Sequence, residues 1–191
     1  MSMADAVVAL RAAAVLVFAA LMLIRVERRD RTAGPRAPRE RRGRLPVVAN
    51  FAAFAVFVTC LAIFATRSDA LLAIPLAMVG CILAAGGAYL VVRARAELGA
   101  AWSLVPEAAH DAGLVMTGPY RRVRHPIYVG LIVLATGQAL AFASWPALVI
   151  VLAGIVPTFV WRARVEETVL ARAFGERYEH YRQGTGMIIP R

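Results

Sequence analysis

The stretch GPYRRVRHPIYVG, Gly118 to Gly130, places three arginines and one histidine directly in front of an apolar run. Proline is tolerated in the first turn of a helix, because the N–H that it lacks would have no partner there. The residue before a proline is pushed away from helical geometry. We therefore expect a helix to begin at Pro126, with Arg124 and His125 at its cap. The backbone N–H groups and the dipole at such a helix start favour a bound anion.

The composition of the chain is that of a membrane protein. Hydrophobic residues make up 60% of the 191 residues, and the mean hydropathy is +0.65. A helix needs roughly 20 apolar residues to cross the ~30 Å hydrocarbon layer. Apolar runs near that length occur at 4–24, 47–66, 70–92, 127–142 and 145–165, of which the fourth is short. The sequence therefore predicts an all-α integral membrane protein with about five transmembrane helices, the last two forming a helical hairpin.

Two short stretches predict how these helices are joined and packed. In ASWP, Ala143 to Pro146, Ser144 should cap the last helix and Pro146 should lie in its first turn. The run AAGGA, Ala84 to Ala88, contains only small residues, which let a neighbouring helix approach closely. We interpret this run as a packing surface. The alternative is a lateral entrance for a lipophilic ligand between the third and fourth spans.

Positive charge is distributed unevenly along the chain. All 22 basic residues are arginine, the net charge is +10, and most arginines lie in the segments 25–44, 93–124 and 162–191. With five spans these segments share one side of the membrane, which the positive-inside rule assigns to the cytoplasm. We therefore expect the N-terminus outside and a cytoplasmic C-terminal helical segment, in the cytoplasmic membrane of a prokaryotic cell. Anionic headgroups explain the charge, so nucleic acid is not an expected partner.

Two adjacent acids, Glu166 and Glu167, follow the last apolar run. They could bind an amine and ribose hydroxyls, or Glu166 could pair with Arg162 four residues earlier, and spacing alone leaves both interpretations open. If the last two spans form a hairpin, the start of one and the end of the other emerge on the same face. The acids would then meet Arg122 and Arg124. A ligand with both an amino group and a carboxylate would use both clusters.

Three stretches in this order resemble one known signature. They are LGAAW (Leu98 to Trp102), LVMTGPYRRVRHPIYVG (Leu114 to Gly130) and EETVLARAFGERYEHYRQGTGMIIP (Glu166 to Pro190). Together they resemble the isoprenylcysteine carboxyl methyltransferase family and its phospholipid methyltransferase relatives, over about half of the chain. The resemblance implies a membrane enzyme that uses S-adenosyl-L-methionine, releases S-adenosyl-L-homocysteine and has no Rossmann domain. The chain accordingly has no GxGxxG following a predicted strand.

The resemblance also implies roles for individual residues. Arg124 and Glu167 are the expected catalytic residues, and Arg122 and Arg124 are expected to bind the acceptor. Tyr178 and Tyr181 match C-terminal aromatic residues of the family, which could simply pack the tail over the site. The expected cofactor contacts are Gly118, Pro119, Tyr120, His125, Tyr128, Glu166 and Glu167. No metal is expected, because His110, His125 and His180 lack ligand spacing.

The chain then divides into two regions. Residues 1–92 would form a three-helix membrane region with an arginine-rich cytoplasmic loop at 25–46, whose role stays open. Residues 93–191 would form the methyltransferase region, with a cofactor loop, the hairpin 127–165 and a C-terminal tail. A carboxylate acceptor would need no general base, whereas an amine or hydroxyl would need one, from Glu167 or His125.

Two other functions compete with methyl transfer. A sterol-reductase-like enzyme would bind NADPH, and a non-catalytic membrane protein would use its arginines to bind anionic lipid headgroups. Within the methyltransferase interpretation, the acceptor could be a prenylated protein, a lipid or a small lipophilic metabolite. The sequence does not separate these acceptors, nor does it indicate an oligomeric state.

Overall fold

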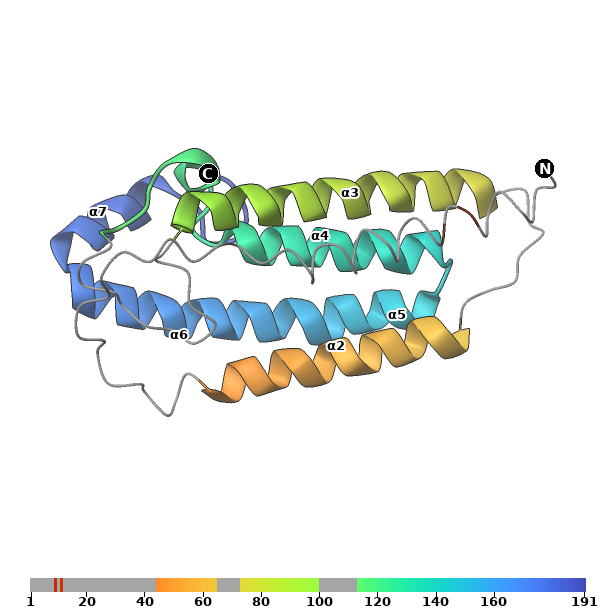
Figure 1. Cartoon of the computed structure of the whole chain (residues 1–191). Coiled ribbons are helices and arrows are strands. Elements are labelled where there is room, and N and C mark those ends of the chain that lie inside the picture. Colours follow the sequence, from red (N-terminus) through yellow and green to blue (C-terminus); the bar gives the residue numbers. More distant parts are fainter. Residues whose placement is uncertain (1–8, 10, 12–43, 65–72, 100–112) are drawn as a thin grey trace.

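The structure is a computed structural model that describes residues 9, 11, 44–64, 73–99 and 113–191. Figure 1 shows two layers, with α3 beside α4 in one and α2 beside α5 and α6 in the other. Within the described residues there is no strand, only an isolated bridge between Val123 and Gly186. The helices are α2 (Arg44–Phe64), α3 (Ala73–Leu98), α4 (Pro126–Ala141), α5 (Trp145–Ile150), α6 (Val156–Phe174) and α7 (Glu176–Gly184).

Three helical stretches are long and apolar enough to cross a membrane. They are Leu45–Phe64, Ala73–Leu98 and Trp145–Phe174, and α4 is a shorter apolar helix. The prediction of a helical integral membrane protein is therefore confirmed. The expected first span, 4–24, falls outside the described residues except for positions 9 and 11, so the count of five stays a prediction.

Backbone contact between α3 and α4 depends on glycine. A Cβ at Gly87 would lie 2.5 Å from the Gly130 carbonyl oxygen, and one at Gly137 would lie 2.5 Å from the Ala84 nitrogen. Small residues let two helices approach this closely, as transmembrane helices commonly do. A Cβ at Gly86 would meet no described atom within 4 Å, because this residue faces away from α4. The small residues therefore pack against α4 at Ala84 and Gly87, and a lateral entrance framed by these two spans stays a hypothesis.

The hairpin turn forms as expected. The Ser144 side chain accepts from the Ala147 N–H at 3.4 Å, and Pro146 lies in the first turn of α5. A π-helical turn, Val151–Ile155, joins α5 to α6. This continuous helix runs to Phe174, so it ends nine residues after the expected end of the hairpin at 165.

The third span also continues beyond its apolar run. α3 reaches Leu98, so Arg93 and Arg95 lie on a helix and not in the loop expected from residue 93. The reason is that RARAEL consists of strong helix formers, which extend a helix whether or not they are apolar. Hydropathy marks where a helix leaves the lipid, not where it ends.

Aromatic side chains fill the space between α2 and the other helices. Phe57 is 1% exposed, and the Phe54 ring meets the Phe57 and Phe159 rings edge-on at centroid distances of 6.3 and 6.1 Å. Nearby, the Asn50 side-chain amide donates to the Thr158 hydroxyl at 2.8 Å. These contacts fix α2 along the helix that carries Glu166 and Glu167.

Candidate functional site

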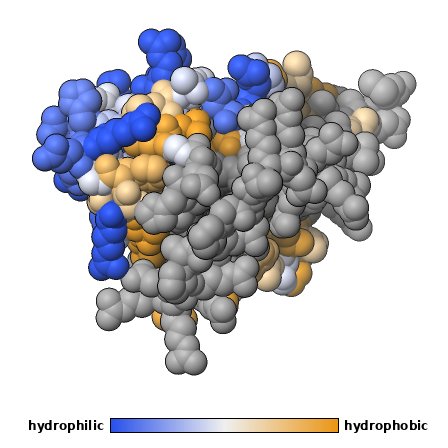
Figure 2. Space-filling model, turned by 60° about the vertical axis from the view of Figure 1, so that its left-hand side comes forward, coloured by the Kyte–Doolittle hydropathy of each residue, from blue (hydrophilic) through white to orange (hydrophobic). Residues whose placement is uncertain are grey.

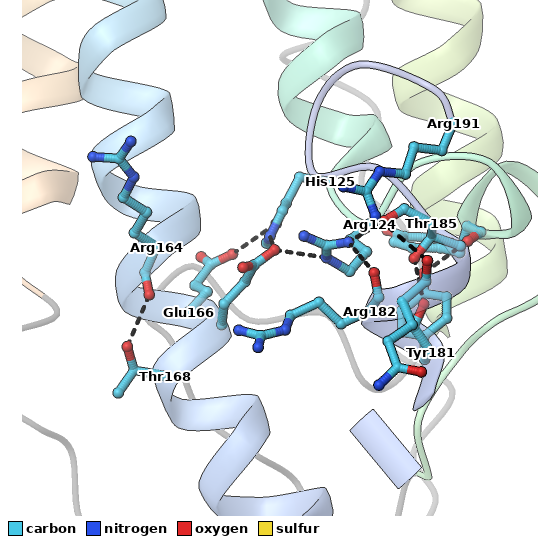
Figure 3. Close-up of polar contacts among 12 residues, drawn as sticks. Arg124, His125, Arg164, Glu166, Thr168, Tyr181, Arg182, Thr185 and Arg191 are labelled. Atoms are coloured by element: carbon cyan, nitrogen blue, oxygen red, sulfur yellow. Dashed lines mark hydrogen bonds and ion pairs between the residues drawn. The ribbon is translucent and has the colours of Figure 1, made fainter. Parts of the chain in front are cut away.

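The start of α4 and the second half of α6 meet at one end of the helical layers. Figure 3 shows Arg124 and His125 between Glu166 on α6 and the segment around Thr185. Seen from the α7 end of the molecule, hydrophilic side chains gather at the upper left and apolar ones lie below them (Figure 2). The hairpin therefore brings the basic and acidic clusters together, as the sequence predicts.

His125 occupies the cap position of α4 and is 6% exposed. Its Nδ1 lies 3.5 Å from Glu166 Oε2, and its Nε2 lies 3.5 Å from Glu167 Oε1. Each ring nitrogen thus faces a carboxylate. Only the protonated imidazole can present an N–H to both.

The charge of His125 depends on two opposing effects. Burial by itself lowers the pKa of the His125 imidazole, because a charged ring loses its hydration. The neighbouring carboxylates of Glu166 and Glu167 act in the other direction and prevail, so the pKa of His125 is raised above its ordinary value. The two carboxylates therefore favour an imidazolium at this position.

Glu166 is held by residues of both layers. The Tyr128 hydroxyl donates to Glu166 Oε1, and Arg162 Nε donates to the same oxygen at 3.2 Å. The Arg162 guanidinium lies over the Tyr128 ring, 5.3 Å from its centroid. Tyr128 also stacks between His125, at 5.3 Å, and Phe159, at 4.8 Å. Of the two alternatives for Glu166, the pair with Arg162 is present, so Arg162 is part of the site.

Arg124 connects α6 to the C-terminal segment. Its Nε donates to Glu167 Oε1 at 2.7 Å, and its Nη1 donates to the carbonyls of Arg182, at 3.1 Å, and Thr185. Its backbone N–H donates to the Gly186 carbonyl at 2.8 Å. The residue expected to bind an acceptor carboxylate thus has several of its donors engaged by the protein itself.

The C-terminal segment also lies across the helix start that we expected to bind an anion. The His125 N–H donates to the Met187 carbonyl at 3.1 Å, parallel to the bond between Arg124 and Gly186. His125 therefore occupies the cap position of α4, as expected. The backbone N–H groups of Arg124 and His125 are both bonded to carbonyls of the C-terminal segment. Arg121 and Arg122 are exposed beside this contact.

The residues GPYR, Gly118–Arg121, form one turn of 3-10 helix between α3 and α4. Gly118 has φ = +57°, a left-handed conformation that glycine adopts most readily. The buried Tyr120 accepts at its carbonyl from the Tyr181 hydroxyl, at 2.7 Å. Tyr178 on α7 is 0% exposed, and its hydroxyl has no hydrogen-bond partner among the described residues.

Sequence reasoning missed two residues at this end. Glu97, at the end of α3, accepts from the Thr117 hydroxyl, and Thr185 supplies a carbonyl to Arg124. Glu97 directly precedes the LGAAW stretch, but nothing in its spacing marks it. The Thr185 carbonyl is a backbone group, so no residue type could reveal it.

The sequence profile of the phospholipid methyltransferase family matches residues 76–177, more than half of the chain. The chain belongs to the phospholipid methyltransferase family. This match covers α4 and α6, and it includes His125, Glu166 and Glu167. The methyltransferase resemblance of the sequence motifs is thereby confirmed.

Two curated relatives carry the same name, protein-S-isoprenylcysteine O-methyltransferase. The protein of Saccharomyces cerevisiae is 32% identical over 115 residues, which are 59% of this chain and 48% of the relative. The protein of Schizosaccharomyces pombe is 31% identical over 106 residues, 54% of this chain and 45% of the relative. The chain therefore spans about half the length of the curated relatives it matches.

A solved structure has the same fold. It is the eukaryotic intramembrane Ras methyltransferase, an isoprenylcysteine carboxyl methyltransferase, with a TM-score of 0.54 and 22% sequence identity. The match covers 79% of this chain and 54% of that chain. These relatives are eukaryotic, so they give no support to the expected prokaryotic origin, and the orientation in the membrane stays a prediction.

Proposed function

We propose that this chain is an integral-membrane, S-adenosylmethionine-dependent methyltransferase that methylates a lipophilic acceptor at the cytoplasmic face. The observation that carries the proposal is the cluster of His125, Glu166 and Glu167, in which α4 and α6 place a histidine between two carboxylates. The family of the chain and the name of its curated relatives support methyl transfer as the chemistry. The acceptor would be an isoprenylcysteine-like carboxylate or a lipid.

The described residues fit the proposed cofactor. Glu166 and Glu167 offer carboxylate oxygens suited to an ammonium group and to ribose hydroxyls. Among the described residues, the buried His125 Nε2 makes no hydrogen bond and lies 3.5 Å from Glu167 Oε1, so a polar ligand atom could join this contact. Together with Tyr128 and the backbone of Gly118 to Tyr120, these residues would hold S-adenosylmethionine.

The bound cofactor would supply a methyl group on a sulfonium, whose departure as a neutral thioether needs no acid. The chain itself then has to align the acceptor and exclude water. The raised pKa of His125 favours its protonated form, which cannot serve as a general base. A carboxylate acceptor is therefore favoured, because it needs no general base. The exposed Arg122 could orient such a carboxylate, while Arg124 holds Glu167 in place.

The depth of the site suits an acceptor that is anchored in lipid. Trp161 on α6 is 44% exposed, and tryptophan is enriched where helices leave the hydrocarbon layer. Glu166 follows five residues later on the same helix, about 7.5 Å further along the axis. The carboxylates would therefore lie at headgroup level, where a lipid tail can stay in the bilayer while the polar cofactor arrives from water.

The first test is binding. Protein in mild detergent is titrated with S-adenosylhomocysteine by calorimetry, beside His125→Ala and Glu167→Gln variants whose folding is checked. Saturable binding by the wild type that is lost in both variants is the expected result. A folded wild type that does not bind would contradict the proposal, and NADPH is then the next titrant. Turnover with a labelled methyl donor, offered prenylated cysteine or extracted lipid, separates the acceptors.

A further inference from the structure

The residues Thr117–Arg121, called the cofactor loop below, have little internal support. Within the loop the Tyr120 N–H donates to the Thr117 carbonyl at 3.1 Å, and the Arg122 N–H donates to the Pro119 carbonyl at 3.3 Å. A 3-10 turn has poorer hydrogen-bond geometry than an α-helix. The loop therefore depends on contacts from outside for a fixed conformation.

The first outside contact comes from the end of α3. Glu97 Oε1 accepts from the Thr117 hydroxyl. The same carboxylate lies against Gly118, where a Cβ would meet Glu97 Oε2 at 2.9 Å. Glu97 thus touches the loop at two consecutive residues. Close backbone packing of α3 on α4 at Gly87 orients the helix that carries Glu97.

The second outside contact comes from α7, which precedes the C-terminal segment. The Tyr181 hydroxyl donates to the Tyr120 carbonyl at 2.7 Å, and both side chains are buried. Burial is the main cause of the raised pKa of Tyr120, and the Tyr181 hydroxyl adds to it. α7 is itself tied down by the bonds from Arg124 to the carbonyls of Arg182 and Thr185.

We propose that Glu97 and Tyr181 are positioning residues that clamp the cofactor loop between α3 and α7. The clamp would hold the backbone of Gly118 to Tyr120 in one conformation before any ligand arrives. A site whose supporting residues fix it in advance loses less entropy when it binds. This inference rests on the proposed function in one respect, namely that the loop contacts S-adenosylmethionine.

Hydrogen exchange of the loop amides tests the clamp without any ligand. We expect Glu97→Ala and Tyr181→Phe each to raise the exchange rate of the 117–123 peptide about five-fold, as loss of one ordinary hydrogen bond does. Glu97→Gln keeps an acceptor for Thr117 and should exchange like the wild type. Tyr178→Phe is the control on the same helix, because its buried hydroxyl interacts with Arg124 and Glu167 and not with the cofactor loop. Unchanged exchange in Glu97→Ala and Tyr181→Phe would overturn the proposal.

Affinity for S-adenosylhomocysteine is the second readout. We expect Glu97→Ala and Tyr181→Phe to raise the Kd several-fold, while Glu97→Gln binds like the wild type. Equal weakening in Glu97→Gln and Glu97→Ala would overturn the positioning role, because the charge and not the hydrogen bond would then matter. If the exchange rates change as expected but the wild type binds no S-adenosylhomocysteine, the clamp stands and the proposed function fails.

A double-mutant cycle isolates the contact between Glu97 and Gly118. Gly118→Ala introduces a Cβ that would lie 2.9 Å from Glu97 Oε2 in the wild type, and this obstacle is absent in Glu97→Ala. The strain from φ = +57° is the same in both backgrounds. We expect Gly118→Ala to weaken binding less in the Glu97→Ala background than in the wild type. Equal losses in both backgrounds would remove Glu97 from the clamp.

Discussion

At the residue scale, the structure separates two glutamates that are adjacent in the sequence. Successive residues of a helix point about 100° apart, so Glu166 and Glu167 turn towards different partners. Glu166 meets Tyr128 and Arg162, whereas Glu167 meets Arg124. Both lie at ion-pair distance from His125. The sequence alone could not divide these roles, because it does not give the rotation of α6 against α4.

Arg124 offers a direct test of this arrangement. Lysine has a single ammonium group and cannot reach both Glu167 and the carbonyls of the C-terminal segment. We expect Arg124→Lys to lower the free energy of unfolding by about 1–3 kcal/mol, measured by thermal unfolding in detergent. The matched control is Arg122→Lys, at an exposed arginine two residues away. Equal stability of the two variants would show that the Arg124 bonds contribute nothing.

The raised pKa of His125 makes stability depend on pH. A histidine whose folded pKa exceeds its unfolded value of about 6.5 contributes stability below that pH and loses it as the pH rises through the folded pKa. His125 is such a group. We therefore expect the stability difference between wild type and His125→Gln to be largest near pH 6 and to shrink towards alkaline pH. Melting curves across this range measure it, and a constant difference would contradict a charged His125.

At the element scale, close contact of α3 and α4 positions the start of α4 beside the end of α3. The contact residues recur along each helix, at Gly80, Ala84 and Gly87 on α3 and at Gly130 and Gly137 on α4. The small residues of the third span were visible in the sequence, and their packing role could be predicted. Which of two adjacent glycines faces α4 could not, because both fit the composition of the run.

Adjacent glycines provide the matched pair for this contact. A side chain at Gly87 would enter the backbone of α4 at Gly130 and Leu134, whereas one at Gly86 would meet no described atom within 4 Å. We expect Gly87→Val to lower the melting temperature markedly, because overpacking typically costs about 1–3 kcal/mol of stability or more. Gly86→Val should stay close to wild type. Similar melting temperatures for the two variants would contradict the helix contact.

At the scale of the whole molecule, two exposed tryptophans indicate how the protein lies in the bilayer. Trp145 begins α5 and is 67% exposed, and Trp161 on α6 is 44% exposed. They are sixteen residues apart on one continuous helical run, or about 24 Å along the axis. This separation is close to the ~30 Å hydrocarbon thickness. Each tryptophan should therefore lie near one membrane interface.

Fluorescence quenching in lipid bilayers tests this placement. In variants that retain only Trp145 or only Trp161, lipids brominated near the headgroup should quench the emission more than lipids brominated near the chain ends. The physical reason is that tryptophan prefers the interface, where its ring is apolar and its N–H stays hydrated. Stronger quenching of Trp161 by the deep probe would place Glu166 and Glu167 inside the hydrocarbon layer and would contradict a headgroup-level site.

The sequence by itself determined the membrane class, the hairpin turn at Ser144, the start of α4 after His125, and the methyltransferase family. These follow from local properties, because hydropathy, proline position and motif residues act over a few neighbouring positions. Only the tertiary structure decided that Arg124 holds Glu167, that the C-terminal segment covers the start of α4, and that Glu97 meets Thr117. Such contacts join distant segments of the chain. They depend on how the helices are rotated and on where backbone carbonyls lie, and neither can be read from the residue pattern.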